Sequence, residues 1–140
     1  MINNKRIIAP KKDIIEVQNA IKVYSQLDSF NANNLKSLSK AHKLLMSGLI
    51  DNPGQFRNTS VGIVKGKDIA HVAPPGEMVF PLMKDLVDYL KYDKDLMLIK
   101  SCVFHYEFEF IHPFVDGNGR LGRLEVILNA QSMNTFRLRL

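Results

Sequence analysis

The residues best suited to chemistry lie in one stretch, residues 112–123, which reads His-Pro-Phe-Val-Asp-Gly-Asn-Gly-Arg-Leu-Gly-Arg. His112 precedes a proline, which disfavours helical backbone for the residue before it, so we expect His112 to end a helix and face the mouth of a loop. An imidazole titrates near neutral pH and can take a proton from a hydroxyl group. Asp116 adds a short carboxylate on the same loop. It suits Mg²⁺, which takes oxygen ligands and keeps phosphate oxygens in its shell.

The second half of this stretch has the parts of an anion site. Gly117 and Gly119 let a ligand approach the backbone closely, and Asn118 is a residue type that often caps a helix N-terminus. Apolar residues at helical spacing follow, so the free N–H groups of a helix N-terminus should face the loop. Arg120 and Arg123 fall on neighbouring positions of that first turn, where they could hold phosphate oxygens. Together these residues predict a site for a nucleoside triphosphate.

Other residues in and around the stretch have simpler interpretations. A phosphate-binding P-loop is excluded because no Gly-Lys-Ser or Gly-Lys-Thr follows the glycines. We expect Phe114 to anchor the loop in the core rather than to contact a substrate. We expect His42 in the core or at its boundary, His71 on the surface of a hairpin, and His105 on a helix face near the site. No His-x-x-x-His or Cys-x-x-Cys spacing supports zinc.

Four helices and a hairpin are predicted upstream of the glycines. Apolar residues recur at helical spacing over residues 13–27, 35–48, 79–90 and 96–110. The last of these runs is strongly apolar and ends next to His112, so we expect a central helix that holds the base in place. Residues 61–64 and 69–72 flank a Lys-Gly-Lys-Asp turn and predict a hairpin.

A hairpin this short is not stable alone, so it must lie on the helices. It could be a surface decoration. We favour a docking edge, because an unpaired strand beside a catalytic loop can hold an incoming peptide by main-chain hydrogen bonds. The residues that we expect in this docking flap are Val61, Gly62, Ile63 and Val64.

Length and composition describe one ordinary globular domain of 140 residues, 46% hydrophobic and 24% charged. Cys102 is the only cysteine, so no internal disulfide can form, and its apolar neighbours predict a buried, unreactive thiol. The net charge is +5, but the lysines are scattered without interleaved aromatic residues, so we do not expect nucleic-acid binding. No apolar run approaches the ~18 residues of a membrane span, and residues 1–10 lack a signal-peptide pattern. We expect a cytoplasmic protein without membrane association.

Residues 112–123 match, without mismatch, the signature of the Fic (filamentation induced by cAMP) domain family, His-Pro-Phe-x-Asp/Glu-Gly-Asn-Gly-Arg-x-x-Arg. The resemblance extends to Glu-Val-Gln-Asn-Ala at residues 16–20, Gly-Gln-Phe-Arg at 54–57, residues 61–75, and His-Tyr-Glu-Phe at 105–108. It implies a mainly α fold: a Fic-type helical bundle over residues 13–128, with a short β-hairpin flap over the active site. A polar arm, residues 1–12, precedes the bundle. The tail, residues 129–140, departs from the family pattern, as a truncation or an altered reading frame would leave it.

The resemblance also implies a protein adenylyltransferase, which transfers AMP from ATP to a Ser, Thr or Tyr hydroxyl of a target protein and releases pyrophosphate. It assigns the general base to His112 and the Mg²⁺ ligand to Asp116. The residues expected to bind the nucleotide are Gly117, Asn118, Gly119, Arg120 and Arg123. In the family a lysine in place of the second glycine accompanies phosphorylation instead, so Gly119 favours adenylylation.

Two alternatives stay open: another Fic transferase that carries UMP, phosphocholine or phosphate, and a non-catalytic module that binds nucleotide or peptide. Many members of the family carry an inhibitory Ser/Thr-x-x-x-Glu helix, whose Glu pairs with the arginine that matches Arg123. This chain has no convincing copy, and Glu16 belongs to the helix that usually follows such a motif. We therefore expect the inhibitory segment to have been cut away or to lie on a separate antitoxin chain, and we expect a catalytically unrestrained enzyme. The expected partners are a protein substrate and, for inhibition, an antitoxin chain or a second copy.

Overall fold

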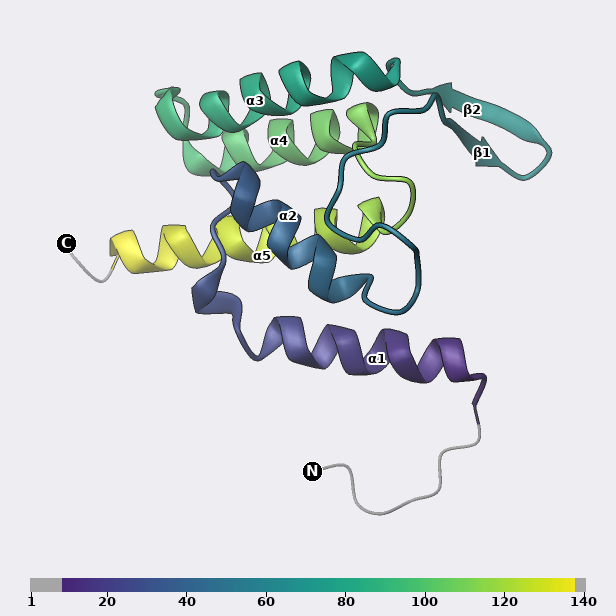
Figure 1. The fold of residues 1–140 in the computed structure, drawn as a ribbon. Helices are drawn as coiled ribbons and strands as arrows, with labels where there is room; N and C mark the ends of the chain where they lie inside the picture. The colour runs from purple at the N-terminus through teal and green to yellow at the C-terminus, as the bar shows by residue number, and fades with distance from the viewer. Residues whose placement is uncertain (1–8, 138–140) are drawn as a thin grey trace.

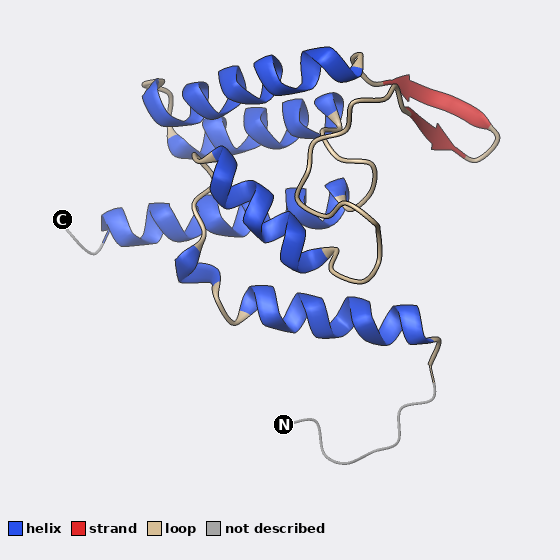
Figure 2. Cartoon of the chain, viewed as in Figure 1, coloured by secondary structure: helices blue, strands red, loops and turns tan. Residues whose placement is uncertain are grey.

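The computed structural model describes residues 9–137 as helices and one β-hairpin, so the mainly α prediction is confirmed (Figures 1 and 2). The elements are α1 (Lys11–Tyr24), the 3-10 turn η1 (Leu27–Ser29), α2 (Leu35–Leu45), β1 (Gly62–Lys65), β2 (Asp68–Val72), α3 (Gly76–Tyr92), α4 (Met97–Ile111) and α5 (Asn118–Arg137). The four predicted upstream helices correspond to α1 through α4. Residues 1–8 of the expected arm lie outside the described residues, and its Lys11 and Lys12 already belong to α1.

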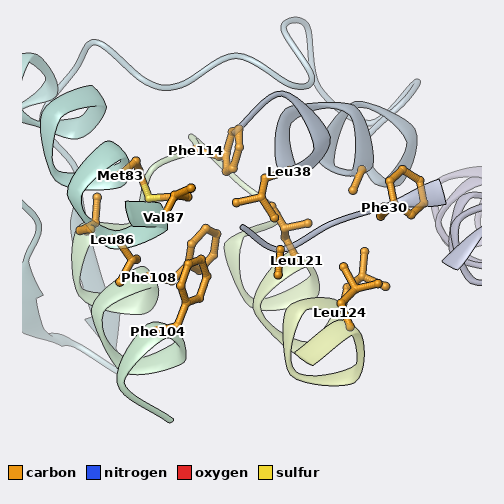
Figure 3. Packing of buried hydrophobic residues seen from close by; sticks show 14 of the residues in the cluster. Phe30, Leu38, Met83, Leu86, Val87, Phe104, Phe108, Phe114, Leu121 and Leu124 are labelled. Carbon is orange, nitrogen blue, oxygen red and sulfur yellow. The ribbon is translucent and has the colours of Figure 1, made fainter. Parts of the chain in front are cut away.

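Helices α3, α4 and α5 lie side by side with α4 in the middle, and α2 crosses one face of this layer (Figure 1). Helix α1 packs on the outer side of α2. Figure 3 shows the core between these helices, where Phe104 and Phe108 of α4 meet apolar side chains of α2, α3 and α5. Both rings are fully buried. This core fixes the helix that leads directly into His112.

Helix α4 has further apolar side chains that its packing against α3 and α5 leaves partly or largely exposed. Its outward residues Ile99, Val103 and Tyr106 are 49%, 38% and 68% exposed. Cys102 lies among them and is exposed, so the prediction of a buried thiol is wrong. The reason is that apolar residues surround α4 on all sides, and spacing alone does not say which side meets the bundle.

Side chains from other elements satisfy the last carbonyls of several helices. Such groups lack an intrahelical donor and need another partner. The Asn19 side chain on α1 donates from Nδ2 to the carbonyls of Leu45 and Ser47, at 3.1 and 2.7 Å, where α2 ends. Lys100 donates from Nζ to the Leu90 carbonyl at 2.8 Å, at the end of α3. These bonds join successive helices at the points where the chain turns.

The predicted hairpin is present as an antiparallel pair in which Gly62 faces Val72 and Lys65 faces Asp68. It projects from the end of the bundle where α3 begins and α4 ends (Figure 1). The register shifts between Ile63 and Val64, because they pair with His71 and Ile69 and leave Ala70 of β2 as an extra residue. Bulges of this kind twist a strand and are frequent beside functional sites.

The last helix continues past the expected boundary at Leu128. Helix α5 runs without a break to Arg137, and both Leu128 and Asn129 are buried. Residues 129–137 therefore complete α5, while residues 138–140 lie outside the described part. No helix within residues 9–137 is both long and apolar enough to cross a membrane.

Candidate active site

His112 ends α4 in a left-handed backbone conformation, with φ 51° and ψ 62°. Its N–H still donates to the Phe108 carbonyl at 2.9 Å, and Pro113 then prevents further helix. Helices often end on a left-handed residue, but that residue is usually glycine, because a side chain there costs roughly 1–2 kcal/mol. The surrounding structure must therefore hold His112 in place.

Arg57 supplies that support from the loop before the hairpin. Its side chain is 3% exposed, and its Nε donates to the His112 carbonyl at 2.7 Å. Nη2 donates to the carbonyls of Ile111 at 2.9 Å and Pro74 at 2.7 Å, and Nη1 to that of Thr59 at 2.6 Å. One guanidinium thus joins the end of α4 to both sides of the hairpin's base. In the sequence, Arg57 was noted only as part of the Gly-Gln-Phe-Arg segment that resembles the family. A single arginine after an aromatic residue does not indicate that its side chain binds four carbonyl groups.

His71 of β2 also contacts the end of α4. Its Nε2 lies 3.0 Å from the Phe110 carbonyl oxygen, and the His71 and Phe110 rings lie 4.4 Å apart. The side chain is half-buried. His71 thus lies on the hairpin as expected, and in addition its side chain contacts α4, because the hairpin lies against α4 at this point.

The loop after His112 is closed from inside by Phe114 and Asn118. Phe114 is fully buried (Figure 3) and stacks on His42 with ring centroids 3.7 Å apart, which are the surroundings that an anchor of the loop would have. The Asn118 side chain pairs with both backbone groups of Phe114: Oδ1 accepts from its N–H at 2.9 Å and Nδ2 donates to its carbonyl at 2.8 Å. Asn118 therefore does not cap the amides of α5 as expected. Gly117 occupies the cap position, since its carbonyl accepts from Leu121 N at 3.0 Å.

His42 on α2 fixes the other side of the loop. Gly54 N–H donates to its Nδ1 at 2.8 Å, so Nε2 carries the proton and donates to the Asp116 carbonyl, also at 2.8 Å. Burial lowers the pKa of His42, although the backbone and charge of Asp116 oppose the shift. The predicted core histidine is thus neutral and positions the Asp116 backbone.

Only glycine fits at position 117. Its φ is +84°, and a Cβ added there would lie 2.5 Å from the Met46 sulfur. Its N–H donates to Oδ1 of Asp116 at 2.6 Å, which orients a carboxylate that is otherwise exposed. The loop backbone thus passes directly over α2, against Met46 and His42.

A cavity of about 240 Å³ joins the predicted site residues. Its lining consists of His112, Val115, Asp116, Gly117, Asn118, Gly119, Arg120 and Arg123. The volume is below the ~300–1,000 Å³ typical of sites that enclose a whole ligand. It suits phosphate groups, with the rest of a nucleotide lying outside.

The two arginines of the cavity differ in their surroundings. Arg120 pairs through Nε with Oε1 of Glu16 on α1 at 2.9 Å, and its Nη1 lies 2.9 Å from the Met46 sulfur. Arg123 is exposed. Helix α1 therefore reaches the site through Glu16, and Arg123 is the more available of the two for an incoming anion.

The profile of the Fic/DOC family matches residues 32–128, which is more than half of the chain. The chain belongs to the Fic/DOC family. A solved Fic family protein from Desulfovibrio desulfuricans is similar over 96% of this chain and 42% of its own, with 44% identity and a TM-score of 0.89. The Fic-1 structure from Caenorhabditis elegans has a TM-score of 0.71 at 22% identity, over 94% of this chain and 39% of its own, which supports the fold alone.

Curated relatives of this Fic chain carry adenylyltransferase names. A probable protein adenylyltransferase from Aquifex aeolicus is 46% identical over 63 residues, 44% of this chain and 19% of the relative. A protein adenylyltransferase from Caenorhabditis elegans is 35% identical over 74 residues, 51% of this chain and 14% of the relative. The chain spans less than a fifth of the length of either relative.

Glu109 on α4, Glu125 on α5 and His112 interact electrostatically beside residues 112–117, which we call the Fic loop. Burial lowers the pKa of His112, while the backbone carbonyl and the charge of Glu109 oppose this shift. The Glu109 carbonyl does not form a hydrogen bond of good geometry with His112. Nδ1 of His112 is buried and has no hydrogen-bond partner among residues 9–137. Glu125 on α5 is fully buried, and neither carboxyl oxygen has a partner there. Burial first, and then the charge of Glu109, raises the pKa of Glu125 well above its usual value. This buried acid could not be predicted, because in the sequence Glu125 resembles an ordinary surface residue of a helix.

The donor set of the Fic loop fits a magnesium nucleotide. Asp116 offers one exposed carboxylate, and Mg²⁺ is usually held by one or two carboxylates together with substrate phosphates. No group of three or more His, Cys, Asp or Glu side chains within the described residues could hold a metal ion alone. The arrangement therefore suits an ion that arrives with phosphate groups.

Proposed function

We propose that this chain acts as a protein adenylyltransferase, transferring AMP from ATP to a Ser, Thr or Tyr hydroxyl of a target protein. The observation that carries the proposal is the single cavity in which His112, Asp116, Arg123 and the first backbone amides of α5 meet. A base, a carboxylate for a hard cation and an anion-binding helix N-terminus are what phosphoryl chemistry requires. The names of the curated relatives support the same class of reaction.

His112 is the general base of the proposed reaction. Its lowered pKa keeps the imidazole neutral at pH 7, and the burial of Nδ1 leaves Nε2 as the nitrogen that a hydroxyl can reach. Nε2 takes the hydroxyl proton while the oxygen forms a bond to the α-phosphorus. The bond between that phosphorus and the oxygen bridging to the β-phosphate breaks, and pyrophosphate leaves. General base catalysis of this kind contributes typically ~10²–10⁴ in rate.

The loop and helix α5 hold the phosphates. The first amides of a helix have no intrahelical partner, so those of Asn118, Gly119 and Arg120 can donate to phosphate oxygens. Held by Asp116, Mg²⁺ would neutralise charge on the α- and β-phosphates. Arg123 is exposed at the rim and steers the outer phosphates. These contacts present the α-phosphate in line with the attacking oxygen.

The flap holds the protein acceptor beside the site. Strand β1, with Val61 before it, offers main-chain groups along residues 61–64, and an extended target segment can add to such an edge. Backbone pairing reads few side chains, so the flap determines where the acceptor lies more than which sequence it has.

The test is incubation of the protein with Mg²⁺ and ATP labelled at the α- or the γ-phosphate, in the presence of cell lysate. Adenylylation predicts protein labelled from α-labelled ATP only, and His112→Ala should abolish the label. Phosphorylation would instead leave the γ label on protein, and labelled UTP or CDP-choline would reveal the other transferases. If no donor labels protein although ATP still raises the melting temperature, the chain is a non-catalytic nucleotide-binding module. Equal labelling by His112→Ala would contradict the assignment of the base.

A further inference from the structure

The flap is fixed to the bundle at its root by Arg57. Arg57 binds the carbonyls of Thr59 and Pro74, one on each side of the hairpin, and the Ala73 N–H donates to the Val61 carbonyl between them at 3.1 Å. A two-stranded hairpin of four and five residues is not rigid alone. A root contact by itself therefore leaves the outer part of the hairpin free to swing about its base.

His71 provides a second attachment further out along the flap. Its Nε2 lies 3.0 Å from the Phe110 carbonyl oxygen, and its ring packs against the Phe110 ring at 4.4 Å. The carbonyl can only accept, so Nε2 carries the proton and donates. Phe110 is in the last turn of α4, where carbonyl groups lack intrahelical donors. The contact thus satisfies a free acceptor two residues before His112.

The partner of His71 in the hairpin is Ile63, which lies in the middle of the expected docking edge. His71 therefore lies directly across the ladder from Ile63, whose neighbours Gly62 and Val64 turn their main-chain groups toward the open edge where a target segment would pair. The next residue, Val72, is 67% exposed, as the alternation of side chains along a strand requires. On β2, His71 thus faces the bundle and the adjacent Val72 faces solvent.

We infer that His71 is a positioning residue for the protein acceptor: by bonding the flap to the Phe110 carbonyl, it sets the height of a docked segment above His112. This inference rests on the proposed function, because height matters only if a hydroxyl must reach the base. Nucleotide binding does not depend on it, since His71 is not among the residues that line the phosphate cavity. Displacing a reacting group by about 1 Å can cost roughly 10²-fold in rate.

The experiment compares His71→Ala, His71→Gln and Val72→Ala in AMP transfer to protein, with ATP affinity measured separately by calorimetry. His71→Ala should lower transfer by about ten- to a hundredfold and leave ATP affinity within about twofold of the wild type. His71→Gln should recover most of the transfer, because its side-chain amide can donate to the same carbonyl. Val72→Ala should match the wild type. Hydrogen exchange of residues 61–73 should be faster in His71→Ala than in the other two variants.

Each result has a definite meaning. Wild-type transfer by His71→Ala, in a preparation where His112→Ala is inactive, overturns the role of His71 and leaves the proposed function intact. Equal losses of transfer and of ATP affinity in His71→Ala also overturn it, since they indicate general damage to the fold. Failure of His71→Gln to recover transfer refutes the hydrogen bond as the cause. If the wild type transfers no AMP, the proposed function fails and the inference falls with it.

Discussion

Replacing Arg57 by methionine tests how the end of α4 is held. Methionine keeps much of the length and apolar character of the side chain but removes every donor. Four carbonyl oxygens, those of Thr59, Pro74, Ile111 and His112, lose their partner. A hydrogen bond to a charged group contributes about 1.5–3 kcal/mol, but burying the cation costs part of that sum. We therefore expect the free energy of unfolding to fall by about 3–5 kcal/mol, a large part of the ~5–15 kcal/mol of a typical domain.

Urea unfolding followed by far-UV circular dichroism measures this loss. For a domain of this size the free energy changes by roughly 1–3 kcal/mol per molar urea, so the midpoint should fall by about 2 M. The urea midpoint of Arg57→Lys should lie between those of the wild type and Arg57→Met, because one ammonium group cannot reach all the carbonyl oxygens that surround the planar guanidinium. Arg123→Met is the matched control: it removes an exposed arginine, and its free energy of unfolding should stay within about 0.5 kcal/mol of the wild-type value.

If the free energy of unfolding of Arg57→Met lies within about 1 kcal/mol of the wild-type value, Arg57 does not hold the end of α4 in the way described. The four bonds would then be exchanged for water at little cost. An equal fall in the Arg123→Met control would also count against it, since the effect would come from lost charge rather than lost carbonyl partners.

Four further predictions concern other residues. Glu125→Met should raise the free energy of unfolding by roughly 1–3 kcal/mol at neutral pH, because the Glu125 carboxyl group is buried and has no hydrogen-bond partner in the part of the chain that the structure describes. Since the pKa of Glu125 is raised from 4.5, the gain should grow as pH rises above that value. The pKa of His42 is lowered from 6.5, so its contribution to stability should be lost as pH falls below 6.5, and His42→Gln should be less sensitive to that fall in urea unfolding. Gly117→Ala should cost about 2–5 kcal/mol of stability, whereas Gly119→Ala, whose Cβ would meet only Arg123 at 3.6 Å, should cost nothing or stabilise slightly. Cys102 should react with a maleimide in the folded protein nearly as fast as in urea, as followed by mass spectrometry.

Each of these has a result that would contradict it. A stability difference between Glu125→Met and wild type that is independent of pH would show that folding does not raise the pKa of Glu125. Parallel pH curves for wild type and His42→Gln would rule out His42 as the titrating group. Equal effects at Gly117 and Gly119 would mean that the positive φ and the contact with Met46 are unimportant. Protection of Cys102 until the protein unfolds would mean that its helix face is covered in solution.

Local patterns predicted the parts of this fold that depend on neighbouring residues. A proline after His112 predicted the end of α4, and alternating residues around a Lys-Gly-Lys-Asp turn predicted the hairpin. Phe114 was predicted as an anchor from its place in the loop, and it stacks on His42. In each case the controlling interaction is steric or lies within a short segment, so the sequence contains it directly.

Long-range partners could not be predicted in the same way. Arg57 binds carbonyls from three separate segments, and backbone carbonyls leave no trace in a sequence. Asn118 had the right type for a helix cap, but its side chain binds Phe114 instead. Cys102 lay in an apolar pattern whose outward side could be chosen only once the neighbouring helices were placed. What remained hidden was the pairing of groups, not their presence.

The outward face of α4 has a practical consequence for anyone who measures this protein. Ile99, Val103 and Tyr106 offer a native apolar surface that hydrophobic fluorescent dyes can bind before any unfolding occurs. Such a dye will glow strongly at low temperature, a signal usually taken for a molten globule. Melting curves of this chain should therefore rest on dichroism or calorimetry, and bright dye fluorescence from a fresh sample should not be mistaken for misfolding.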